Sequence, residues 1–469
     1  MKMRATTSKK AVVLSLLAML LLAATVWWAV IGHKLSRSPL QLRGSSESLT
    51  IAATGDWLRS EPVSFGQTDT GFARVLEILK HASLGLTNLE VNLLDPKSVP
   101  PAEVPGMVRW PYGTIRQAED LKKFGLNVIS LANNRAMDYG PDGLKQTQDI
   151  LDDVGLLHVG AGADLRVARS AVALGASPRR VAVIAVTTSA SSESRATNTN
   201  GEILGRPGVN AIRYSPDVTV DSATFEILKK LPSTAPHEPG GDTNRLLVSG
   251  TPIKRGDKTV VKFLPDERDV QEVLEQVKFA RSKCDVVVVM LHSHEPSNHS
   301  QNAAEFVQTL AHSFIDAGAS LVVGSGPHQL RGIEMYERGA ILYSLGNFST
   351  DYTFAGSRAS DVYDSGLDLY QLSIGAAGNL QEYPAQQFEE PVWRESVVAI
   401  AAYGQGKIKS LSLQPIELGA ELPPRQRGLP RIASPERASA ILRRLAALSK
   451  NLGTNIQIEN GIGTVDVSR

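Results

Sequence analysis

VVVMLHSHE, residues 287–295, opens the stretch that decides the fold, which continues to Phe348. A helical pattern, EFVQTLAHSFIDAGA (305–319), comes next, followed by two further apolar runs, LVVGSGPHQLRG (321–332) and AILYSLGNF (340–348). Short apolar runs predict strands, and apolar residues at every third or fourth position predict the helix. Histidines lie in the loops after the first two strands. Because ligands bind at the carboxyl ends of the strands of an open α/β sheet, we expect these loops to share one site.

The composition excludes some classes of partner. The chain has 469 residues, of which 42% are hydrophobic and 21% are charged, which is enough for one large or two ordinary domains with a substantial core. The formal net charge of +1 comes without a long basic run, so no nucleic-acid partner is expected. The single cysteine, Cys284, excludes an intramolecular disulfide and is interpreted as a small buried hydrophobe.

The N-terminus carries a targeting signal. Basic residues are frequent in residues 1–10, and an uncharged, mostly apolar run follows at 11–31. The run matches the ~20 residues that span a bilayer, and a tryptophan pair lies near its end, which favours an uncleaved signal anchor over a cleavable signal peptide. We therefore predict a single-pass protein of the cell membrane, with residues 1–10 cytoplasmic, residues 32–48 a polar linker, and the main domain extracytoplasmic.

From Leu49 onward, apolar runs alternate with helical patterns. LTIAATGDW (49–57), LGLTNLEVN (84–92) and LNVISLANNRAMDYG (126–140) each predict a strand that ends in polar residues. RVAVIAVTT (180–188) continues the alternation as a buried strand. Such alternation is typical of an α/β fold with a mainly parallel, helix-covered sheet.

Two regions depart from this alternation. Residues 189–265 are rich in Ser, Asn, Pro and Gly, with one helix-like piece, TFEILKKL (224–231), and one strand-like piece, KTVVKFL (258–264). We interpret this region as an inserted cap beside the site; a solvated insertion without a role in the site is the alternative. After Phe348, the runs LDLYQLSIG (367–375), ESVVAIAAYG (395–404) and IKSLSLQPIELG (408–419) predict antiparallel strands that complete a domain of residues 49–418. Residues 419–469 are a C-terminal extension with an amphipathic helix.

Six polar side chains fall at strand ends or in the loops that follow them: Asp56, Glu90, Asn134, His292, His294 and His328. Oxygen and imidazole ligands of this kind suit a borderline divalent metal such as Mn, Fe or Zn. Taken singly, an Asp or Asn after a strand is typical of a helix cap or a turn, and a lone His is typical of a hydrogen-bonded surface residue. Because all six lie at strand ends, we predict a metal site. The remaining candidates, His81, His158 and His312, lie on helical or loop stretches and are interpreted as structural.

Several strings resemble one family, in this order along the chain: TGDWLRS (54–60), LTNLEVNLL (86–94), NVISLANNRAMDYGPDGLKQTQDIL (127–151), VVVMLHSHE (287–295), IDAGASLVVGSGPHQLRGIEMYERGAILYSLGNF (315–348) and IKSLSLQPIEL (408–418). They are similar to the CapA family of capsule and poly-γ-glutamate biosynthesis proteins, also called PgsA. The resemblance implies a calcineurin-like metallophosphoesterase-type layered sandwich with an inserted cap region. It also implies a membrane anchor with an outward-facing domain, and a role in making, exporting or anchoring an anionic capsular polymer.

The resemblance extends to individual ligands. It implies that Glu90 is a bridging carboxylate and that the metal ligands are Asp56, Glu90, Asn134, His292 and His328. Two positions depart from the family's pattern. Arg135 stands where a His usually follows Ala-Asn-Asn, and Ser325 stands where a His commonly follows Gly324.

These two departures change the expected chemistry. A two-metal hydrolytic site needs a bridging carboxylate and enough neutral donors for each ion, so the loss of a His at position 325 thins the donor set. His294 is a candidate replacement that spacing alone does not establish. The Arg135 guanidinium stays charged and cannot deliver a proton, but it can clamp a carboxylate or phosphate with two parallel hydrogen bonds. The substitution therefore favours anion binding over acid–base turnover.

Three functions stay open at this point. The first is a membrane-anchored capsule or poly-γ-glutamate biosynthesis factor that binds the anionic polymer at a cleft with Arg135 and His328. Its expected partners are membrane-bound capsule synthesis and export proteins. The second is a metal-dependent hydrolase or transferase of that polymer, and the third is a phosphoesterase, suggested by fold analogy alone. The candidate catalytic residues are Arg135 and His292, and the candidate substrate-binding residues are Asn133, Arg135, His294, Glu295 and Arg331.

Overall fold

The computed structural model describes residues 42–43, 48–63, 65, 69–95, 97–98, 112–232, 234–236, 242–350, 390–419, 422 and 426–468. The predicted anchor at 11–31 lies outside the described residues, and among the described helices none is long and apolar enough to cross a bilayer. A boundary between two units falls between Leu42 and Arg43, so Arg43 belongs with the folded domain rather than with the predicted linker.

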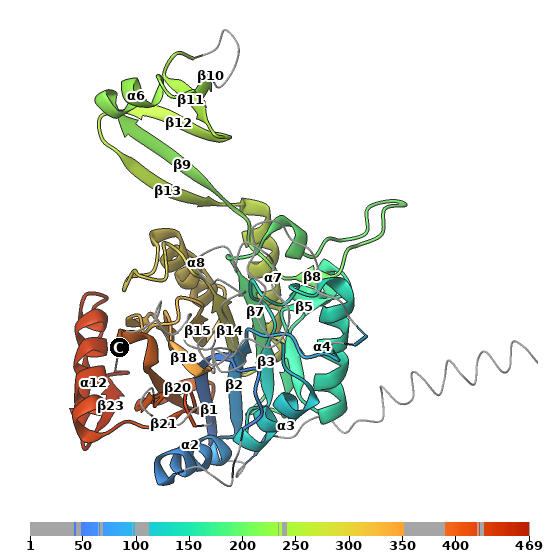
Figure 1. Ribbon diagram of the computed structural model, residues 1–469. Helices are drawn as coiled ribbons and strands as arrows, with labels where there is room; N and C mark the ends of the chain where they lie inside the picture. The colour runs from blue at the N-terminus through green and yellow to red at the C-terminus, as the bar shows by residue number, and fades with distance from the viewer. Residues whose placement is uncertain are drawn as a thin grey trace, which may run out of the picture. The chain divides into compact units, whose positions relative to one another are not determined.

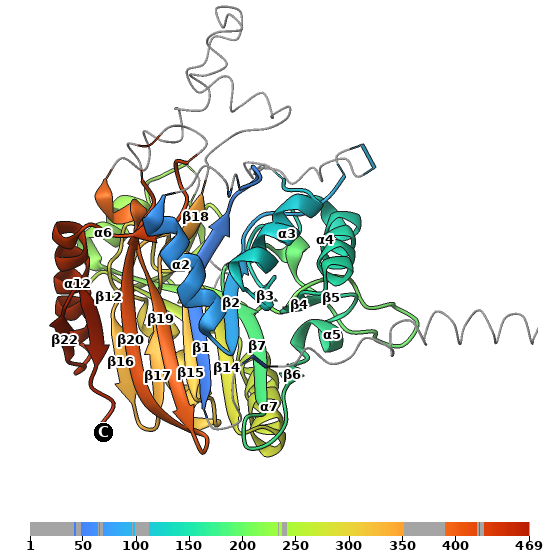
Figure 2. The ribbon, with the colours of Figure 1, turned by 90° about the horizontal axis from the view of Figure 1, so that it is seen from below.

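The first sheet has the strand order β22-β23-β20-β19-β1-β2-β3-β4, with β18 beside β1 and β21 beside β20. Its parallel part consists of β1 (Leu49–Leu58), β2 (Leu84–Leu89), β3 (Val128–Ser130), β4 (Leu157–Val159) and β18 (Asn347–Thr350). Its antiparallel part consists of β19 (Glu395–Gly404), β20 (Lys407–Glu417), β21 (Arg431–Ile432), β22 (Ile456–Glu459) and β23 (Ile462–Val465). Figure 2 shows helices covering one face of this sheet: α2 (Thr70–His81), α3 (Ile115–Phe124) and α4 (Gly140–Val154).

The second sheet has the order β16-β17-β15-β14-β7-β6. Its strands are β6 (Val172–Leu174), β7 (Val181–Thr187), β14 (Val286–His292), β15 (Leu321–Ser325), β16 (Ile333–Tyr336) and β17 (Gly339–Leu342). The four central strands, β17, β15, β14 and β7, are parallel. Helices α7 (Glu267–Lys283) and α8 (Glu305–Asp316) pack on its outer face, and α5 (Leu165–Arg169) contacts β7.

The two sheets face each other, as the side chains of β14 indicate, since they alternate between two environments. Val287, Val289 and Leu291 pack with α7 and α8, whereas His292 lies on the opposite face of the strand. A hydrogen bond of 3.3 Å from the Tyr403 hydroxyl to a backbone carbonyl at the start of β15 also joins the sheets. The mixed α/β class predicted from the sequence is confirmed, and β19 and β20 match the antiparallel strands expected at 395–404 and 408–419. The expectation of one mainly parallel sheet is replaced by two sheets.

The run AILYSLGNF, read above as a single strand, belongs to both sheets. Its first half is β17 and its last residues begin β18, so the chain crosses between the sheets at Gly346, whose φ is 71°. A Cβ on Gly55 of β1 would lie 1.8 Å from the Gly346 carbonyl oxygen. Only glycine permits this approach, which places β18 directly beside Asp56.

Most of the inserted region forms a sheet of its own, with the order β10-β11-β12-β9-β13 (Figure 1). The strands are β9 (Tyr214–Asp221), β10 (Thr234–Pro236), β11 (Arg245–Val248), β12 (Thr251–Gly256) and β13 (Val260–Pro265), and we call this the cap sheet. Helix α6 (Ser222–Leu228) covers it, and Val220, Phe225, Leu246 and Ile253 form its small core. The helix-like and strand-like pieces were predicted correctly; the other four strands were not.

Short elements connect these parts. They are β5 (Ala161–Gly162), β8 (Gly208–Val209), and the 3-10 turns η2 (Ser192–Ser194) and η3 (Pro391–Arg394). The predicted C-terminal helix is α12 (Pro435–Lys450), with Ser434 as its N-cap, and an additional hairpin, β22–β23, follows it. The predicted strand at 367–375 lies outside the described residues.

Candidate metal centre

Polar side chains from both sheets meet where the parallel strands end. Asp56 precedes a register shift in the pairing of β1 with β18, and Glu90 directly follows β2. Asn134 lies in the loop after β3, His292 ends β14, and His328 lies in the turn after β15 with a φ of 59°. The left-handed backbone at His328 is unusual for a residue other than glycine and is a kind of strain found at functional sites.

Asp56 is held by donors on both carboxylate oxygens. The Asn88 amide donates to Oδ1 at 2.8 Å, and the Gly326 backbone N–H donates to Oδ2 at 3.0 Å. Nδ1 of His292 lies 3.9 Å from Oδ1, and Nδ1 of His328 lies 3.7 Å from Oδ2. Burial raises the pKa of Asp56 to about 6, although these hydrogen bonds act in the opposite direction.

Glu90 lies at the centre of the group. Its Oε1 is 3.8 Å from His294 Nε2 and 4.0 Å from His328 Nε2. Its Oε2 is buried without a hydrogen-bond partner among the described residues. Burial, and next the charge of Asp56, raise the pKa of Glu90 well above its usual range. A buried carboxylate oxygen without a donor costs free energy, and a bound cation would remove that cost.

The imidazoles present lone pairs to this carboxylate. Nδ1 of His294 lies 2.7 Å from Asn298 Oδ1 and Nδ1 of His328 lies 3.0 Å from Asn347 Oδ1, so both Nδ1 atoms donate and both Nε2 atoms are acceptors. Nε2 of His292 lies 3.1 Å from both His294 Nε2 and Asn134 Oδ1. One proton on His292 cannot satisfy two acceptors, so the cluster has more acceptors than donors.

The histidines are held neutral. Burial is the main cause that lowers the pKa of His292 well below its usual range, lowers the pKa of His294, and lowers the pKa of His328 to about 3. A neutral imidazole is the form that binds a metal ion. Two triads have ligand atoms that all lie within 4.8 Å of one another: Asp56, Glu90 and His292, and Glu90, His294 and His328. Since they share Glu90 and leave its Oε2 without a donor, the donor set fits one or two divalent ions.

Arg135 lies at the edge of this cluster. Its Nη1 is 3.6 Å from Asp138 Oδ2, and 15% of its side chain is exposed. Its charge lowers the pKa of Glu90, although burial outweighs that effect. The guanidinium therefore pairs with Asp138 while remaining largely buried.

Three of the predicted substrate-binding residues have other contacts. Asn133 is fully buried and donates to Asn88 Oδ1 at 3.1 Å and to the Leu89 carbonyl at 2.8 Å. Arg331 is 1% exposed and donates to backbone carbonyls of the loop 294–300, including that of Glu295 at 2.8 Å. The Glu295 carboxylate accepts hydrogen bonds from Thr188, Ser189, Ser293 and Tyr214. These contacts favour framework roles for the three residues, because their polar atoms are already used inside the protein.

Three polar residues of the site were not proposed as ligand-supporting residues from the sequence: Asn88, Ser325 and Asn347. Asn88 joins Asp56 to Asn133, Ser325 Oγ lies 3.0 Å from His292 Nδ1, and Asn347 orients His328. A signal for Asn88 existed, since it lies two residues before Glu90 and so shares its face of the strand. His294, which the sequence left open, joins the cluster that lost a histidine at position 325.

Comparison with known proteins identifies the family. Residues 50–352, which are most of the chain, match the protein family described as "Bacterial capsule synthesis protein PGA_cap". The chain belongs to the PGA_cap family. The resemblance to capsule and poly-γ-glutamate synthesis proteins stated above is thereby confirmed.

Individual relatives agree with this assignment. This PGA_cap chain is 36% identical over 433 residues, 89% of this chain and 93% of the relative, to the uncharacterized protein y4sH of Sinorhizobium fredii. It is 26% identical over 380 residues, 80% of this chain and 75% of the relative, to the capsule biosynthesis protein CapA of Bacillus anthracis. It is also 31% identical over 260 residues, 54% of this chain and 53% of the relative, to a probable polyglutamine synthesis accessory protein of Mycobacterium tuberculosis.

Proposed function

We propose that this PGA_cap chain is a capsule-polymer biosynthesis factor that binds an anionic polymer, of the poly-γ-glutamate type, at a divalent-metal centre. The ion would be held by Asp56, Glu90, Asn134, His292, His294 and His328. The observation that carries the proposal is the acceptor-rich cluster around Glu90, whose Oε2 has no donor among the described residues. We further infer a metallophosphoesterase type of sandwich, because two facing sheets bring the ends of parallel strands to one site.

The residues of the site have different roles in polymer binding. A divalent ion in the cluster would supply Lewis-acid chemistry and positive charge. Arg135, at the edge of the cluster, supplies a second positive charge and paired N–H donors, which suit a carboxylate of the polymer. Asp138 keeps the guanidinium in place. The buried neutral histidines give the site no positive charge of their own, so polymer binding depends on the ion and on Arg135.

The location and partners belong to the same proposal. An anchor at residues 11–31 would hold the domain on the outer side of the cell membrane, beside membrane-bound proteins that make and export the polymer. Support comes from the length and apolarity of this run and from the CapA proteins among the relatives.

Elemental analysis of the purified protein, combined with polymer binding before and after chelation, tests the proposal. We expect one or two equivalents of Mn, Fe or Zn, and a loss of poly-γ-glutamate binding on chelation that is restored by adding the ion back. A metal-free protein that binds the polymer equally well would overturn it.

A second candidate is metal-assisted cleavage or transfer of the polymer backbone. It is favoured by the position of His294. With His292 and His328 it gives the cluster three imidazoles, although Ser325 replaces the histidine that the family commonly has. Release of polymer fragments, or of polymer joined to an added amine, would distinguish this function from binding alone. A phosphoesterase is the third candidate and rests only on the type of fold.

A further inference from the structure

Glu295 lies at the centre of a cage of hydroxyl groups behind the metal-binding cluster. Its Oε1 accepts from Tyr214 Oη at 2.9 Å and from Ser189 Oγ at 2.9 Å. Its Oε2 accepts from Thr188 Oγ1 at 2.6 Å and from Ser293 Oγ at 2.7 Å. Hydroxyl donors on both oxygens of a buried carboxylate fix its position, and the carboxylate in turn fixes the segments that supply the donors.

One of these segments leads directly to His294. The Ser189 hydroxyl that donates to Glu295 also accepts the backbone N–H of His294 at 2.9 Å. Arg331 holds the carbonyl of Glu295 from the other side at 2.8 Å. His294 lies beyond the end of β14, so the sheet does not position it as it positions His292. This network therefore supplies the order that the strand gives to the other histidine.

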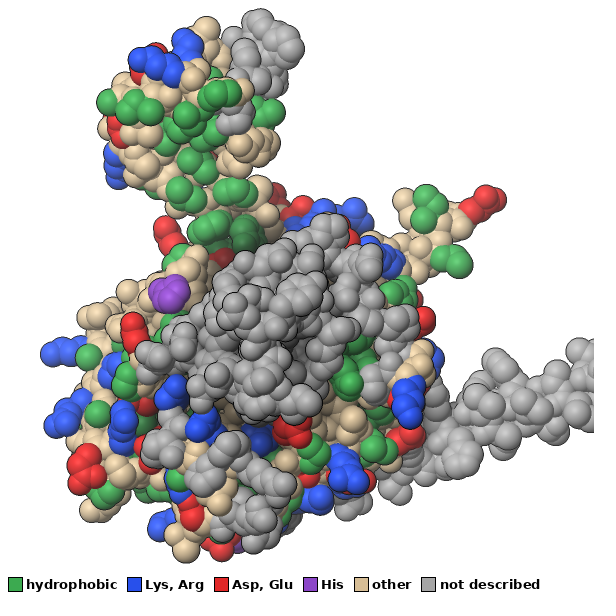
Figure 3. Space-filling view, viewed as in Figure 1, with side chains coloured by type: hydrophobic (Ala, Val, Ile, Leu, Met, Phe, Trp, Pro, Cys, Tyr) green, Lys and Arg blue, Asp and Glu red, His purple; other side chains and the backbone are tan. Residues whose placement is uncertain are grey.

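A second segment leads to the cap sheet. Tyr214 is the first residue of β9, and its ring packs against Phe263 of β13, with centroids 5.3 Å apart, and against Phe306 of α8, with centroids 5.2 Å apart. Hydrophobic side chains also gather on the surface where the cap sheet joins the rest of the domain (Figure 3). β9 and β13 are the strands by which the cap sheet is attached, so Tyr214 stands at its base.

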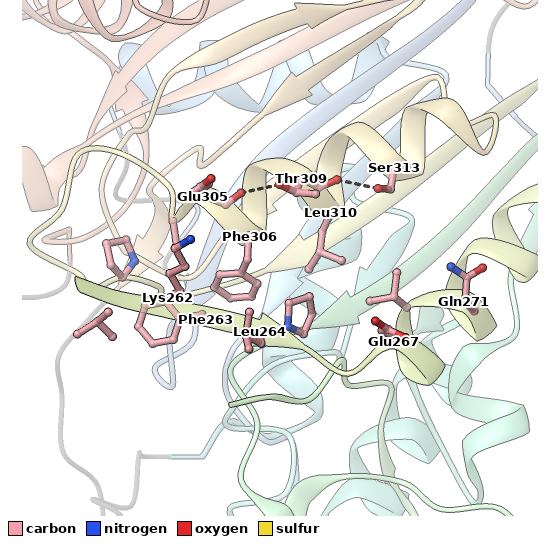
Figure 4. Close-up of a pocket in the computed structure, with 15 residues that line it drawn as sticks. Lys262, Phe263, Leu264, Glu267, Gln271, Glu305, Phe306, Thr309, Leu310 and Ser313 are labelled. Atoms are coloured by element: carbon pink, nitrogen blue, oxygen red, sulfur yellow. Dashed lines mark hydrogen bonds between the residues drawn. The ribbon is translucent and has the colours of Figure 1, made fainter. Parts of the chain in front are cut away.

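The base of the cap sheet borders a cavity. A cavity of about 710 Å³ lies between β13 and the helices α7 and α8, with Phe263 and Phe306 in its wall (Figure 4). The hydroxyls of Thr309 and Ser313 bond to carbonyls of their own helix, at 3.0 and 2.8 Å, so this wall of the cavity is largely apolar. The two phenylalanines that contact Tyr214 are thus not packed on every side.

We propose that Glu295 is a positioning residue which, through Tyr214 and Ser189, couples the base of the cap sheet to His294, so that the cap sheet controls how His294 completes the ion-binding cluster. The effect on ion binding rests on the proposed function, in which His294 is a ligand of the ion. It assigns the inserted region a role in the site, which the sequence left open.

Two substitutions test the coupling in the full-length protein. Tyr214→Phe keeps the ring packing and removes only the hydroxyl, and Glu295→Gln keeps the size of the side chain and exchanges one acceptor for a donor. The chain offers a matched control pair, because the Tyr343 hydroxyl donates to Glu334 at 2.7 Å in the same domain but outside the cluster. The controls are Tyr343→Phe and Glu334→Gln.

The first readout is the binding of Zn²⁺ by calorimetry. We expect Tyr214→Phe and Glu295→Gln to weaken Zn²⁺ binding about tenfold, as is typical when a group that orients a ligand is lost. In a His294→Ala background the same substitutions should have no further effect. Unchanged affinity, an equal loss in the control pair, or an undiminished effect without His294 would each overturn the coupling.

The second readout needs no metal. Hydrogen exchange of the amides in residues 293–300 should accelerate in Glu295→Gln and Tyr214→Phe, and should stay unchanged in both controls. If the wild-type protein binds no ion but the exchange result holds, the proposed function fails while the coupling stands. If Zn²⁺ binds to the wild-type protein and exchange is unaltered in all variants, the coupling fails alone.

Discussion

Arg135 is the residue at which the site departs most clearly from the pattern of its family. Its guanidinium is 3.6 Å from Asp138 and largely buried at the edge of the cluster. Arg135→Lys keeps the charge but loses the paired donors, so we expect polymer binding to weaken by about 1–2 kcal/mol. Titration of poly-γ-glutamate by calorimetry measures the difference.

Arg135→His separates binding from turnover. An imidazole donates and accepts protons near neutral pH, so this variant should bind the polymer more weakly while hydrolysing it faster in the presence of the ion. If neither substitution changes polymer binding or hydrolysis, Arg135 serves only as the partner of Asp138.

The proposed metal ligands are expected to contribute unequally to the affinity for the ion. Asp56 and His292 belong to strands and are each fixed by hydrogen bonds, whereas His294 depends on the loop that follows β14. Asp56→Ala and His292→Ala should each remove the ion, and His294→Ala should retain part of it. Elemental analysis after dialysis measures the ion content of each variant. His312→Ala is the control, because His312 pairs with Glu334 outside the cluster. Full occupancy in Asp56→Ala would remove Asp56 from the ligand set.

At the scale of elements, the cap sheet has its own small core. Phe225 of α6 is fully buried among Val220, Leu246 and Ile253. Phe225→Ala should cost about 3–5 kcal/mol, and because this core is separate, the loss should fall on the cap sheet rather than on the two facing sheets. Limited proteolysis followed by mass spectrometry should find new cuts within residues 214–265. Phe279→Ala, at a side chain of α7 that is 63% exposed, is the control expected to leave the pattern unchanged.

An ion-pair group joins α5 and α7 near the base of the cap sheet. Asp269 of α7 accepts from Arg169 at 3.1 Å and from Arg213 at 2.7 Å. Burial opposes ionisation, but the hydrogen bonds and charges of the two arginines outweigh it and lower the pKa of Asp269. The stabilisation is therefore complete above the unfolded pKa of ~3.9 and is lost as the pH falls through the lower folded value.

Asp269→Asn tests this group. We expect a loss of about 2 kcal/mol in the free energy of unfolding at pH 7, and convergence of the two proteins as the pH falls below about 4. Urea denaturation at several pH values measures both. Asp149→Asn, which breaks an exposed pair with Lys145, should cost less than about 1 kcal/mol at any pH. A difference between Asp269→Asn and wild type that is the same at pH 7 and pH 3 would contradict the assignment.

For the whole molecule, the folded domain is expected to be independent of the anchor predicted at residues 11–31, and its boundary lies at Arg43. The Arg43 guanidinium donates to Asn127 at 2.6 Å and to the Lys80 carbonyl at 3.0 Å, and its own carbonyl accepts from Arg179 at 3.0 Å. Chains that begin at residue 43 or at Leu49 should both be soluble and unfold cooperatively. The shorter one should be less stable by about 1–3 kcal/mol because it lacks these bonds. An insoluble product from either start would show that preceding residues contribute to the fold.

The sequence predicted the parts of the molecule that depend on local pattern. The period of the apolar residues located strands such as β1, β2 and β14, and their polar ends located Asp56, Glu90 and His292. The crossing at Gly346 was not predictable, because one apolar run serves two sheets and the reason is its contact with Gly55. The framework role of Arg331 was hidden for a similar reason: it depends on a loop that folds back over the side chain.

The pairing of β1 with β18 determines when the site can exist. Asp56 and Asn347 are neighbours across these two strands, although one lies near the beginning of the domain and the other follows most of its helices. A nascent chain that lacks Asn347 has neither the strand beside Asp56 nor the amide that orients His328. Under the proposed function, ion uptake thus waits until synthesis has passed Asn347.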